Sequence, residues 1–531
     1  MIVSPKGVTV AADAVPKVAT WRRPGQGGVL VFVAGCVLLL LATDRILRGV
    51  AAILRPVEAM YGEAIIYDQA ARLLRGEALY QALDRSPFTV TAYTPLYYSL
   101  VAGLQVLAGP GFGPGRILSF GAGLLAAILV GRLAARRVGD WRAGLFAGVL
   151  FLGLGFPGDY PWFAFYKEDM LGVALSLGAI AMLDSGCDRR RAVGAGVLAG
   201  LAFVSKQTFV AASIAGLWWL WCRNRVSAVV FAASILIVGV GPCAVAALSN
   251  YTFLDNTVRA NLNPYSMDIL VSNLAILGRY QAVAFALALL PVLSRARQIR
   301  SWLQDPLVVF WLISVLLLPV ELAKVGSNWN YWIESAAATA VLATRGVWLF
   351  VLSGEMPPVG RLAASAGLLA VLASPCWLPP PAADLGTVLD RTLHPDERQA
   401  TQFAAVLERV RAEPRGVLAE PLDIVTLAGR EILLEPYIFS ILDVTGQWDA
   451  ASVVRQICTG QIGLLVLDHP LEGPDWQTHG YNHWPVAVLD ALRTTMQLER
   501  TQAALYLYVP VSRPGGPEQK DASAKPCRGV A

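Results

Sequence analysis

Long apolar segments restrict this chain to a membrane. A helix needs roughly 20 mostly apolar residues to span a bilayer, and such segments recur between residues 27 and 378. Of the 531 residues, 15% are charged and 55% are hydrophobic, whereas soluble domains contain about 25% charged residues. The sequence therefore predicts an all-α polytopic membrane protein. We expect spans at 27–43, 116–135, 141–157, 170–184, 192–204, 208–222, 226–249, 276–294, 306–323, 335–352 and 361–378.

Arginine clusters orient the predicted spans. They occur in alternate connections, at 132–137, 189–191, 223–225 and 295–300. They lie on one side of the membrane only if the short apolar segment 94–109 does not cross it. Because positively charged connections stay in the cytoplasm, we expect a cytoplasmic N-terminal tail at 1–26. The transmembrane domain at 27–378 then has about eleven helices, and the C-terminus lies outside.

The chain changes character after residue 378. The proline-rich stretch Leu378–Pro381 indicates the exit from the membrane, because proline ends helices. Strand-like and helix-like segments then alternate, which predicts a small extracytoplasmic α/β domain at 379–512 and a disordered tail at 513–531. We expect helices at 396–413, 449–459 and 486–494, and strands at 416–419, 462–468 and 505–510.

The residue types available restrict the chemistry. All four histidines lie in the C-terminal region, at His394, His469, His479 and His483. The membrane part must therefore use carboxylates, lysines and arginines, which gather in the predicted outer segments 44–115, 158–169, 205–207, 250–275 and 324–334. No basic stripe indicates a nucleic-acid partner. The seven cysteines have no metal-ligand spacing. Cys458 and Cys527, with Cys376 at a membrane edge as a third candidate, could share an oxidising compartment, where a disulfide is possible.

Three motifs and one further segment occur in a characteristic order in this chain. They are Gly62-Glu63-Ala64 with the downstream Tyr93-Thr-Pro95-Leu96, Arg116-Ile-Leu-Ser119 with Arg136-Arg137, Tyr166-Lys-Glu-Asp169-Met-Leu171, and the segment Lys324–Glu334. Over about residues 25–350 the chain resembles the GT-C superfamily of membrane glycosyltransferases, near the protein mannosyltransferase and lipid A sugar-transferase branch. The resemblance implies a GT-C-like helical bundle in the inner or plasma membrane, with its active site on the extracytoplasmic side.

The resemblance also implies the reaction. A polyprenyl-phosphate-linked hexose or pentose is the donor, a lipid or glycan is the acceptor, and membrane lipids surround both. The acceptor hydroxyl displaces the lipid phosphate at the anomeric carbon. Phosphate is a good leaving group, so a carboxylate base and cations near the phosphate suffice, without a cofactor.

Two carboxylates match the acidic positions of the superfamily. Glu63 opens the first outer loop, and the resemblance makes it the catalytic base; an interfacial helix cap is the structural alternative. Asp169 matches the acidic position of the second loop, where some members hold a divalent metal, although an acid also suits a helix N-terminus. Here Lys167 and Glu168 precede Asp169, and the lysine partly replaces a cation. We therefore favour catalysis without a metal.

Further outer residues, together with Lys167 and Glu168, are candidates for substrate binding. Lys206, Arg259 and Lys324 could bind phosphate, although Lys206 could instead extend to the membrane interface. Asp68 is a second acidic candidate. Asn330 and Tyr331 could contact the sugar. Aromatic residues also populate membrane interfaces without binding anything.

Two other classes of function compete with a transferase. A transporter or flippase would place polar groups near the bilayer midplane and often contains internal repeats, whereas polar residues here gather in outer segments and no repeat is visible. A non-catalytic membrane scaffold would leave the acidic first loop and the outer lysines without a role. The sequence favours the enzyme.

Overall fold

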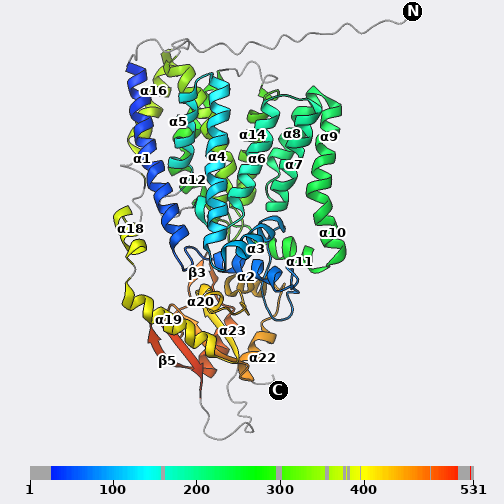
Figure 1. Ribbon diagram of the computed structural model, residues 1–531, viewed down its shortest axis with the longest axis vertical. Helices are drawn as coiled ribbons and strands as arrows, with labels where there is room; N and C mark the ends of the chain where they lie inside the picture. The colour runs from blue at the N-terminus through cyan, green and yellow to red at the C-terminus, as the bar shows by residue number, and fades with distance from the viewer. Residues whose placement is uncertain are drawn as a thin grey trace, which may run out of the picture.

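The computed structural model describes residues 26–156, 162–294, 302–352, 358–374, 378, 383–394, 396–478, 480–511 and 527. A bundle of long helices forms one end of the molecule, and a sheet with short helices forms the other (Figure 1). The predicted N-terminal tail, apart from Gln26, and the predicted disordered tail, apart from Cys527, lie outside the described residues. So does most of the proline-rich exit.

Each predicted span overlaps a helix of the bundle. These helices are α1 (Gln26–Leu54), α4 (Gly113–Val138), α5 (Trp141–Leu154), α6 (Asp169–Asp184), α7 (Arg189–Ser205), α8 (Ala211–Arg223), α9 (Arg225–Ile235) with α10 (Gly241–Ser249), α12 (Met267–Leu293), α14 (Pro306–Leu322), α15 (Ile333–Val347) and α16 (Pro358–Leu372). Within the described chain, 5 helical segments are long and apolar enough to cross a membrane, namely Gly27–Leu54, Gly113–Val138, Arg225–Ser249, Met267–Leu293 and Trp329–Leu352. The count of eleven crossings stays a prediction.

Glycines allow neighbouring helices of the bundle to touch through their backbones. A Cβ atom added to Gly131 of α4 would lie 2.9 Å from the carbonyl oxygen of Gly144 in α5. A Cβ added to Gly144 would lie 2.8 Å from the carbonyl oxygen of Gly131. Such close approach is how helices pack in lipid, where the surroundings are as apolar as the helix faces.

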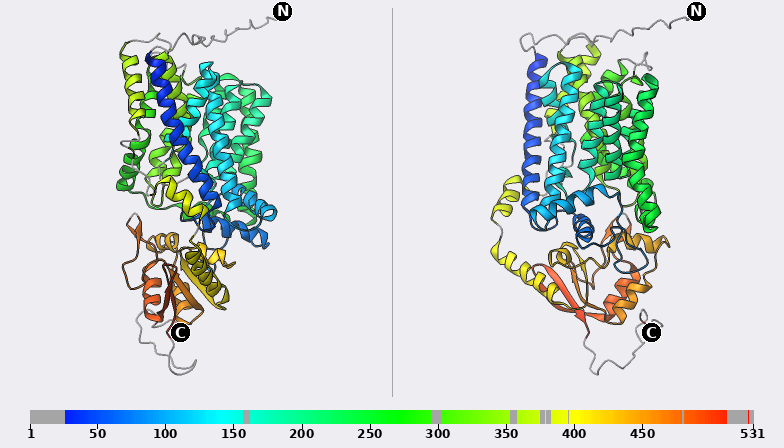
Figure 2. Two further views of the ribbon diagram at one scale, coloured as in Figure 1. Left: turned by 60° about the vertical axis from the view of Figure 1, so that its left-hand side comes forward. Right: turned by 45° about the vertical axis from the view of Figure 1, so that its right-hand side comes forward.

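Two shorter helices, α2 (Glu63–Leu74) and α3 (Leu96–Ala108), cover the end of the bundle that faces the sheet. Helix α3 lies across this end and does not run along the bundle (Figures 1 and 2). It buries Tyr97 and Tyr98 and exposes Val106 and Leu107, as expected of a helix that lies on a surface. The apolar segment 94–109 therefore does not run with the spanning helices, in agreement with the prediction from the arginines.

The C-terminal region contains a four-stranded sheet in the order β1-β2-β6-β5. The predicted strands correspond to β1 (Gly416–Glu420), β2 (Ile462–Leu467) and β6 (Leu505–Pro510). Strands β1 and β2 are parallel, and β6 is antiparallel to β2. The edge strand β5 (Met496–Gln502) was not predicted, because its sequence is mostly polar and exposed and has no apolar alternation.

Helices cover both faces of this sheet. Helices α19 (Glu397–Ala412) and α20 (Asp423–Leu427) pack on one face, and α21 (Pro436–Val444), α22 (Ala451–Cys458) and α23 (Val486–Thr495) contribute to the core on the other. The small β3 (Gln477–Thr478) and β4 (Tyr481–Asn482) hairpin, with α20 and α21, was not predicted. Cys458 at the end of α22 forms a disulfide with Cys527.

The first outer loop joins the bundle to the C-terminal region. Phe88 forms a β-bridge with Leu434. The side chain of Gln69 in α2 donates a hydrogen bond to Glu435 at 3.2 Å, and the backbone N–H of Glu58 donates to Asp423 at 2.8 Å. The acidic first loop is therefore enclosed between the bundle and the sheet.

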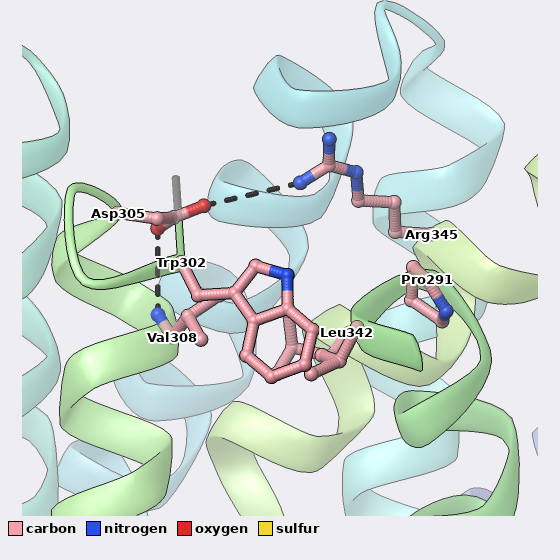
Figure 3. Close-up of a pocket in the computed structure, with 7 residues that line it drawn as sticks. Pro291, Trp302, Asp305, Val308, Leu342 and Arg345 are labelled. Carbon is pink, nitrogen blue, oxygen red and sulfur yellow. Dashed lines mark hydrogen bonds and ion pairs between the residues drawn. The ribbon is translucent and has the colours of Figure 1, made fainter. Parts of the chain in front are cut away.

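A small pocket lies where α14 begins, at the end of the bundle away from the sheet, and Figure 3 shows it in close-up. Asp305 before α14 pairs there with Arg345 at 3.9 Å and with Arg137 at 2.6 Å, and Trp302 covers the space beside them. The pocket measures about 20 Å³, which is room for a single water molecule. Its size excludes a sugar, so the candidate active site lies elsewhere.

Candidate active site

A buried ion pair lies at the bundle end that faces the sheet. Asp169 is the first residue of α6, and Lys206 directly follows α7. The Lys206 Nζ atom lies 2.6 Å from Asp169 Oδ1, and the amide of Asn330 donates to the same oxygen at 2.8 Å. Chain segments that are 37 and 161 residues apart therefore meet at one carboxylate. Three predicted site residues are brought together.

Two aromatic rings and a second carboxylate complete this cluster. Lys206 Nζ lies 4.6 Å from the ring centre of Tyr93 and 4.7 Å from that of Tyr331, within the range of cation–π attraction. Glu168 Oε1 lies 3.4 Å from Lys206 Nζ. Predicted residues Glu168 and Tyr331 thus belong to the site, which we call the Lys206 cluster: Tyr93, Glu168, Asp169, Lys206, Asn330 and Tyr331.

The cluster concentrates charge in a nearly water-free place. Asp169 and Lys206 have relative exposures of 2% and 1%. Burial lowers the pKa of Lys206, but the charge of Asp169, together with those of Tyr93, Tyr331 and Glu168, outweighs burial and holds this pKa well above its usual range. Burial, and then the charge of Asp169, raises the pKa of Glu168. The ion pair of Lys206 and Asp169 is therefore the charged centre, and Glu168 is the carboxylate more easily protonated.

Three carboxylate oxygens of the cluster lack a hydrogen-bond partner among the described residues. They are Asp169 Oδ2 and both Oε atoms of Glu168. Unsatisfied buried acceptors are rare in folded proteins and cost free energy, so each needs an explanation. Because Asp169 Oδ1 already accepts from Lys206 and Asn330, Asp169 is held in place with Oδ2 free to accept a proton or a hydroxyl.

Lys324 is a half-buried cation close enough to the Lys206 cluster to feel the charge of Lys206. It belongs to the loop after α14, where it forms a β-bridge with Tyr265. Burial, and then the positive charge of Lys206, lowers the pKa of Lys324 to about 8. Among the described residues Lys324 forms no ion pair. Its charge is therefore available for an anionic ligand, whereas that of Lys206 is neutralised by carboxylates.

We expect the affinity of the protein for a phosphate-bearing ligand to fall as the pH rises through about 8. Lys324 carries its charge below its pKa of about 8 and loses the charge above it. The loss of one charged hydrogen bond weakens binding roughly tenfold. The measurement is the dissociation constant of the ligand at several pH values from 6.5 to 9.5. Most other lysines stay charged over this range, because their pKa values are higher. In Lys324→Arg the guanidinium stays charged, so an unchanged pH dependence in that variant would exclude Lys324 as its source.

Glu63 is buried outside the Lys206 cluster, in an ion pair with Arg116. Its Oε2 and Oε1 atoms pair with Arg116 at 2.6 and 3.0 Å. The backbone N–H groups of Ala59 and Tyr166 donate to the same carboxylate at 2.7 and 2.8 Å. Both side chains of the ion pair have 0% exposure. This carboxylate accepts four hydrogen bonds, two on each oxygen, so neither oxygen is free to take a proton and the geometry does not favour its predicted role as the base.

Arg116, a residue of α4, binds the first loop through several hydrogen bonds. Beyond Glu63, it donates to the backbone carbonyl oxygens of Ala52, Arg55 and Val57 at 2.6–2.8 Å. The hydrogen bond from the Tyr166 N–H to Glu63 extends this network to the turn that carries Glu168 and Asp169. The Glu63–Arg116 pair therefore supports the turn from which the Lys206 cluster is built.

The remaining predicted site residues lie outside the Lys206 cluster. Asp68 is buried in an ion pair with Arg72 at 2.9 Å. Arg259 is exposed and lies 3.9 Å from Asp255. Lys167 rests against Gly62, where an added Cβ would lie 3.3 Å from its Nζ atom. Asp68 contributes to the junction with the C-terminal region, while Lys167 lies between the two carboxylate sites.

Two residues of the site were not predicted. Tyr93 belongs to the motif Tyr93-Thr-Pro95-Leu96, which does not itself indicate a binding role, and its ring covers Lys206. Arg116 was noted only at the start of a span, although a buried arginine requires an acidic partner. That requirement is the sequence signal that could have paired Arg116 with Glu63.

Comparison with known proteins identifies the fold. No protein family model and no curated protein matches the sequence. The crystal structure of ArnT from Cupriavidus metallidurans in the apo state matches with a TM-score of 0.57 and 14% identity, over 91% of this chain and 99% of that chain. The structure of ArnT from the same organism bound to undecaprenyl phosphate matches with a TM-score of 0.55 and 13% identity, over the same shares of 91% and 99%. The protein therefore has the fold of ArnT along most of its length, as its resemblance to the GT-C superfamily implied.

Proposed function

We propose that this protein is an integral membrane glycosyltransferase that moves a sugar from a polyprenyl-phosphate donor to an acceptor hydroxyl. The observation that carries the proposal is the Lys206 cluster, a buried carboxylate held by an ammonium group at the end of the bundle. The fold shared with ArnT supports it, since one of the ArnT structures contains undecaprenyl phosphate. Transfer of a hexose or a pentose fits these observations equally.

In this proposal Asp169 is the catalytic base. Its free Oδ2 accepts the proton of the acceptor hydroxyl, while Lys206 and Asn330 hold Oδ1. The acceptor oxygen forms a bond to the anomeric carbon, and the bond from that carbon to the phosphate oxygen breaks. Polyprenyl phosphate leaves with the electron pair. General base catalysis of this kind contributes about 10²–10⁴-fold to a rate.

The cations have separate roles in this scheme. Lys206 is surrounded by two carboxylates and two rings, so it orients Asp169 and keeps it charged. Lys324 feels the charge of Glu321 but forms no ion pair among the described residues, so it is the better candidate for the donor phosphate. A divalent metal does not fit between Glu168 and Asp169, because the ammonium group lies 3.4 and 2.6 Å from their oxygens. We therefore propose catalysis without a metal.

The proposed active site faces the extracytoplasmic side. The arginine clusters at 132–137, 189–191 and 223–225 support this orientation because they lie at the end of the bundle away from the sheet. The disulfide between Cys458 and Cys527 also supports it, since disulfides persist in oxidising compartments. The C-terminal α/β region would then cover the active site from outside, in the inner or plasma membrane.

A transfer assay tests the proposal against a transporter or flippase. The purified protein in lipid nanodiscs would receive a polyprenyl-phosphate-linked hexose or pentose and a cell-envelope extract as the acceptor source. We expect released polyprenyl phosphate and a labelled product. Lys206→Met should abolish both, because Asp169 loses its counter-ion, whereas Arg259→Ala should retain activity because Arg259 is exposed. Donor moved across vesicle membranes without any release of polyprenyl phosphate would support the transporter instead.

A further inference from the structure

The carboxyl ends of the parallel strands β1 and β2 carry polar and aromatic residues that the transfer reaction does not use. Glu420 is the last residue of β1, and Asp468 and His469 directly follow β2. The backbone N–H of Asp468 donates to the Glu420 carbonyl oxygen at 3.0 Å, so these two strand ends lie side by side. Ligands of α/β sheets bind at the carboxyl ends of strands. This edge faces the bundle, near β3 and α20 in Figure 1.

Five rings form a continuous aromatic band at this edge. His483 is the centre, with ring centroids 5.2 Å from Tyr437, 6.2 Å from Trp476 and 6.2 Å from Tyr61. Trp476 continues the band to His469 at 5.7 Å. Trp476 and Tyr61 are 53% and 37% exposed. Large exposed aromatic groups that also have polar neighbours are typical of binding surfaces.

Polar groups fix the rings of this band. His483 Nδ1 lies 2.7 Å from Glu420 Oε1, and its Nε2 lies 2.8 Å from the hydroxyl of Thr478. His469 Nδ1 lies 2.8 Å from Asp468. His483, the central ring, is thus held on both sides, and a ring held in this way loses little conformational entropy when a ligand binds. The band is therefore a pre-organised surface.

Two buried carboxylates beside the band keep free acceptor atoms. Glu420 Oε2 and Asp475 Oδ1 have no hydrogen-bond partner among the described residues, and the side chains of these residues are 8% and 4% exposed. Acceptors of this kind suit the hydroxyl groups of a ligand. Together with Asp468 they make the site electronegative, which disfavours anionic ligands.

We propose that this edge is a binding subsite for a neutral oligosaccharide, the acceptor of the transfer reaction. A pyranose has an apolar C–H face, which suits the exposed rings of Trp476 and Tyr61, and hydroxyl groups, which suit Glu420 and Asp475. Tyr61 directly precedes Gly62, against which Lys167 rests, so the band leads from the sheet to the turn of Glu168 and Asp169. The acceptor role rests on the proposed function, whereas oligosaccharide binding does not.

Direct binding to the full-length protein in nanodiscs tests this subsite without any transfer. The probes are neutral tetrasaccharides of glucose, mannose and galactose, with a tetrasaccharide of galacturonic acid as the anionic comparison. We expect at least one neutral probe to bind, and to bind more tightly than the anionic one. Trp476→Ala should weaken this binding by about tenfold or more, as is usual for an aromatic anchor. Trp141→Ala removes an exposed tryptophan at the far end of the bundle and should have no effect.

A second variant separates recognition from folding. Glu420→Gln keeps the shape of the side chain but removes its charge. It should therefore reduce the difference in affinity between the neutral and the anionic probes. The thermal unfolding temperature of Trp476→Ala should equal that of the wild type, which shows that its loss of binding is not a loss of folding. Failure of all the neutral probes to bind, or binding that is equal in Trp476→Ala, would overturn the subsite. Binding without any transfer activity would leave the subsite valid and contradict the proposed function alone.

Discussion

Replacement of Asp169 by asparagine is expected to reduce sugar transfer by about 10²–10⁴-fold, the usual contribution of a general base. Asparagine keeps the size of the side chain and can still accept a hydrogen bond from Lys206, but it cannot take a proton at neutral pH. Binding of polyprenyl phosphate should survive, because the proposed phosphate contact is Lys324. The measurement is single-turnover transfer with saturating donor, together with a donor-binding titration.

Asp268→Asn is the matched control for this experiment. Asp268, like Asp169, is an acid in the first turn of a bundle helix, but it is exposed. A helix-dipole effect of each acid would be of similar size, about 0.3–1 kcal/mol, so only Asp169→Asn should affect turnover strongly. Full activity of Asp169→Asn would remove the base assignment from this residue. Glu168, with two free oxygens, would then be the next candidate.

Replacement of Glu63 by glutamine is expected to destabilise the protein strongly. The substitution leaves Arg116 as a buried charge without a counter-ion, and breaking a buried pair in this way costs about 3–5 kcal/mol. We expect a large decrease in the thermal unfolding temperature. Activity should fall in proportion to the loss of folded protein, so turnover per folded molecule should change little.

The exposed pair of Arg75 and Glu77 provides the control for Glu63. Its two hydrogen bonds, at 2.8 and 2.9 Å, are bidentate, like those between Arg116 and Glu63. Exposed ion pairs contribute about 0–1 kcal/mol, so Glu77→Gln should leave the unfolding temperature nearly unchanged. A Glu63→Gln protein of normal stability that has lost turnover would restore Glu63 as the base and contradict the structural role assigned here.

Much of the architecture could be predicted from local sequence. The apolar segments coincide with the bundle helices because a helix inserts in lipid according to its own side chains. The arginine distribution also placed the segment 94–109 outside the set of spanning helices, where α3 lies. In the C-terminal region, apolar strands such as Ile462–Leu467 were predictable, while the exposed polar strand β5 was not.

The candidate site could be predicted only in part from the sequence. The outer acids and lysines were recognised as a set, and five of the predicted residues do meet around Lys206. The roles within the set were not predictable. Asp68 and Glu63 appear equivalent to Asp169 in the sequence, yet each pairs with a buried arginine, whereas Asp169 keeps one oxygen free.

The sequence alone therefore determined that the chain is a helical membrane protein, which end of the bundle holds its polar residues, and which family it resembles. The tertiary structure alone decided which carboxylate is neutralised, which is free, and where the aromatic band of the C-terminal region lies. The physical reason is that some of the interactions are local in the sequence and others join residues that are far apart in it. Transfer of a segment into lipid depends on that segment's own composition, whereas burial and ion pairing depend on distant residues that meet only in the fold.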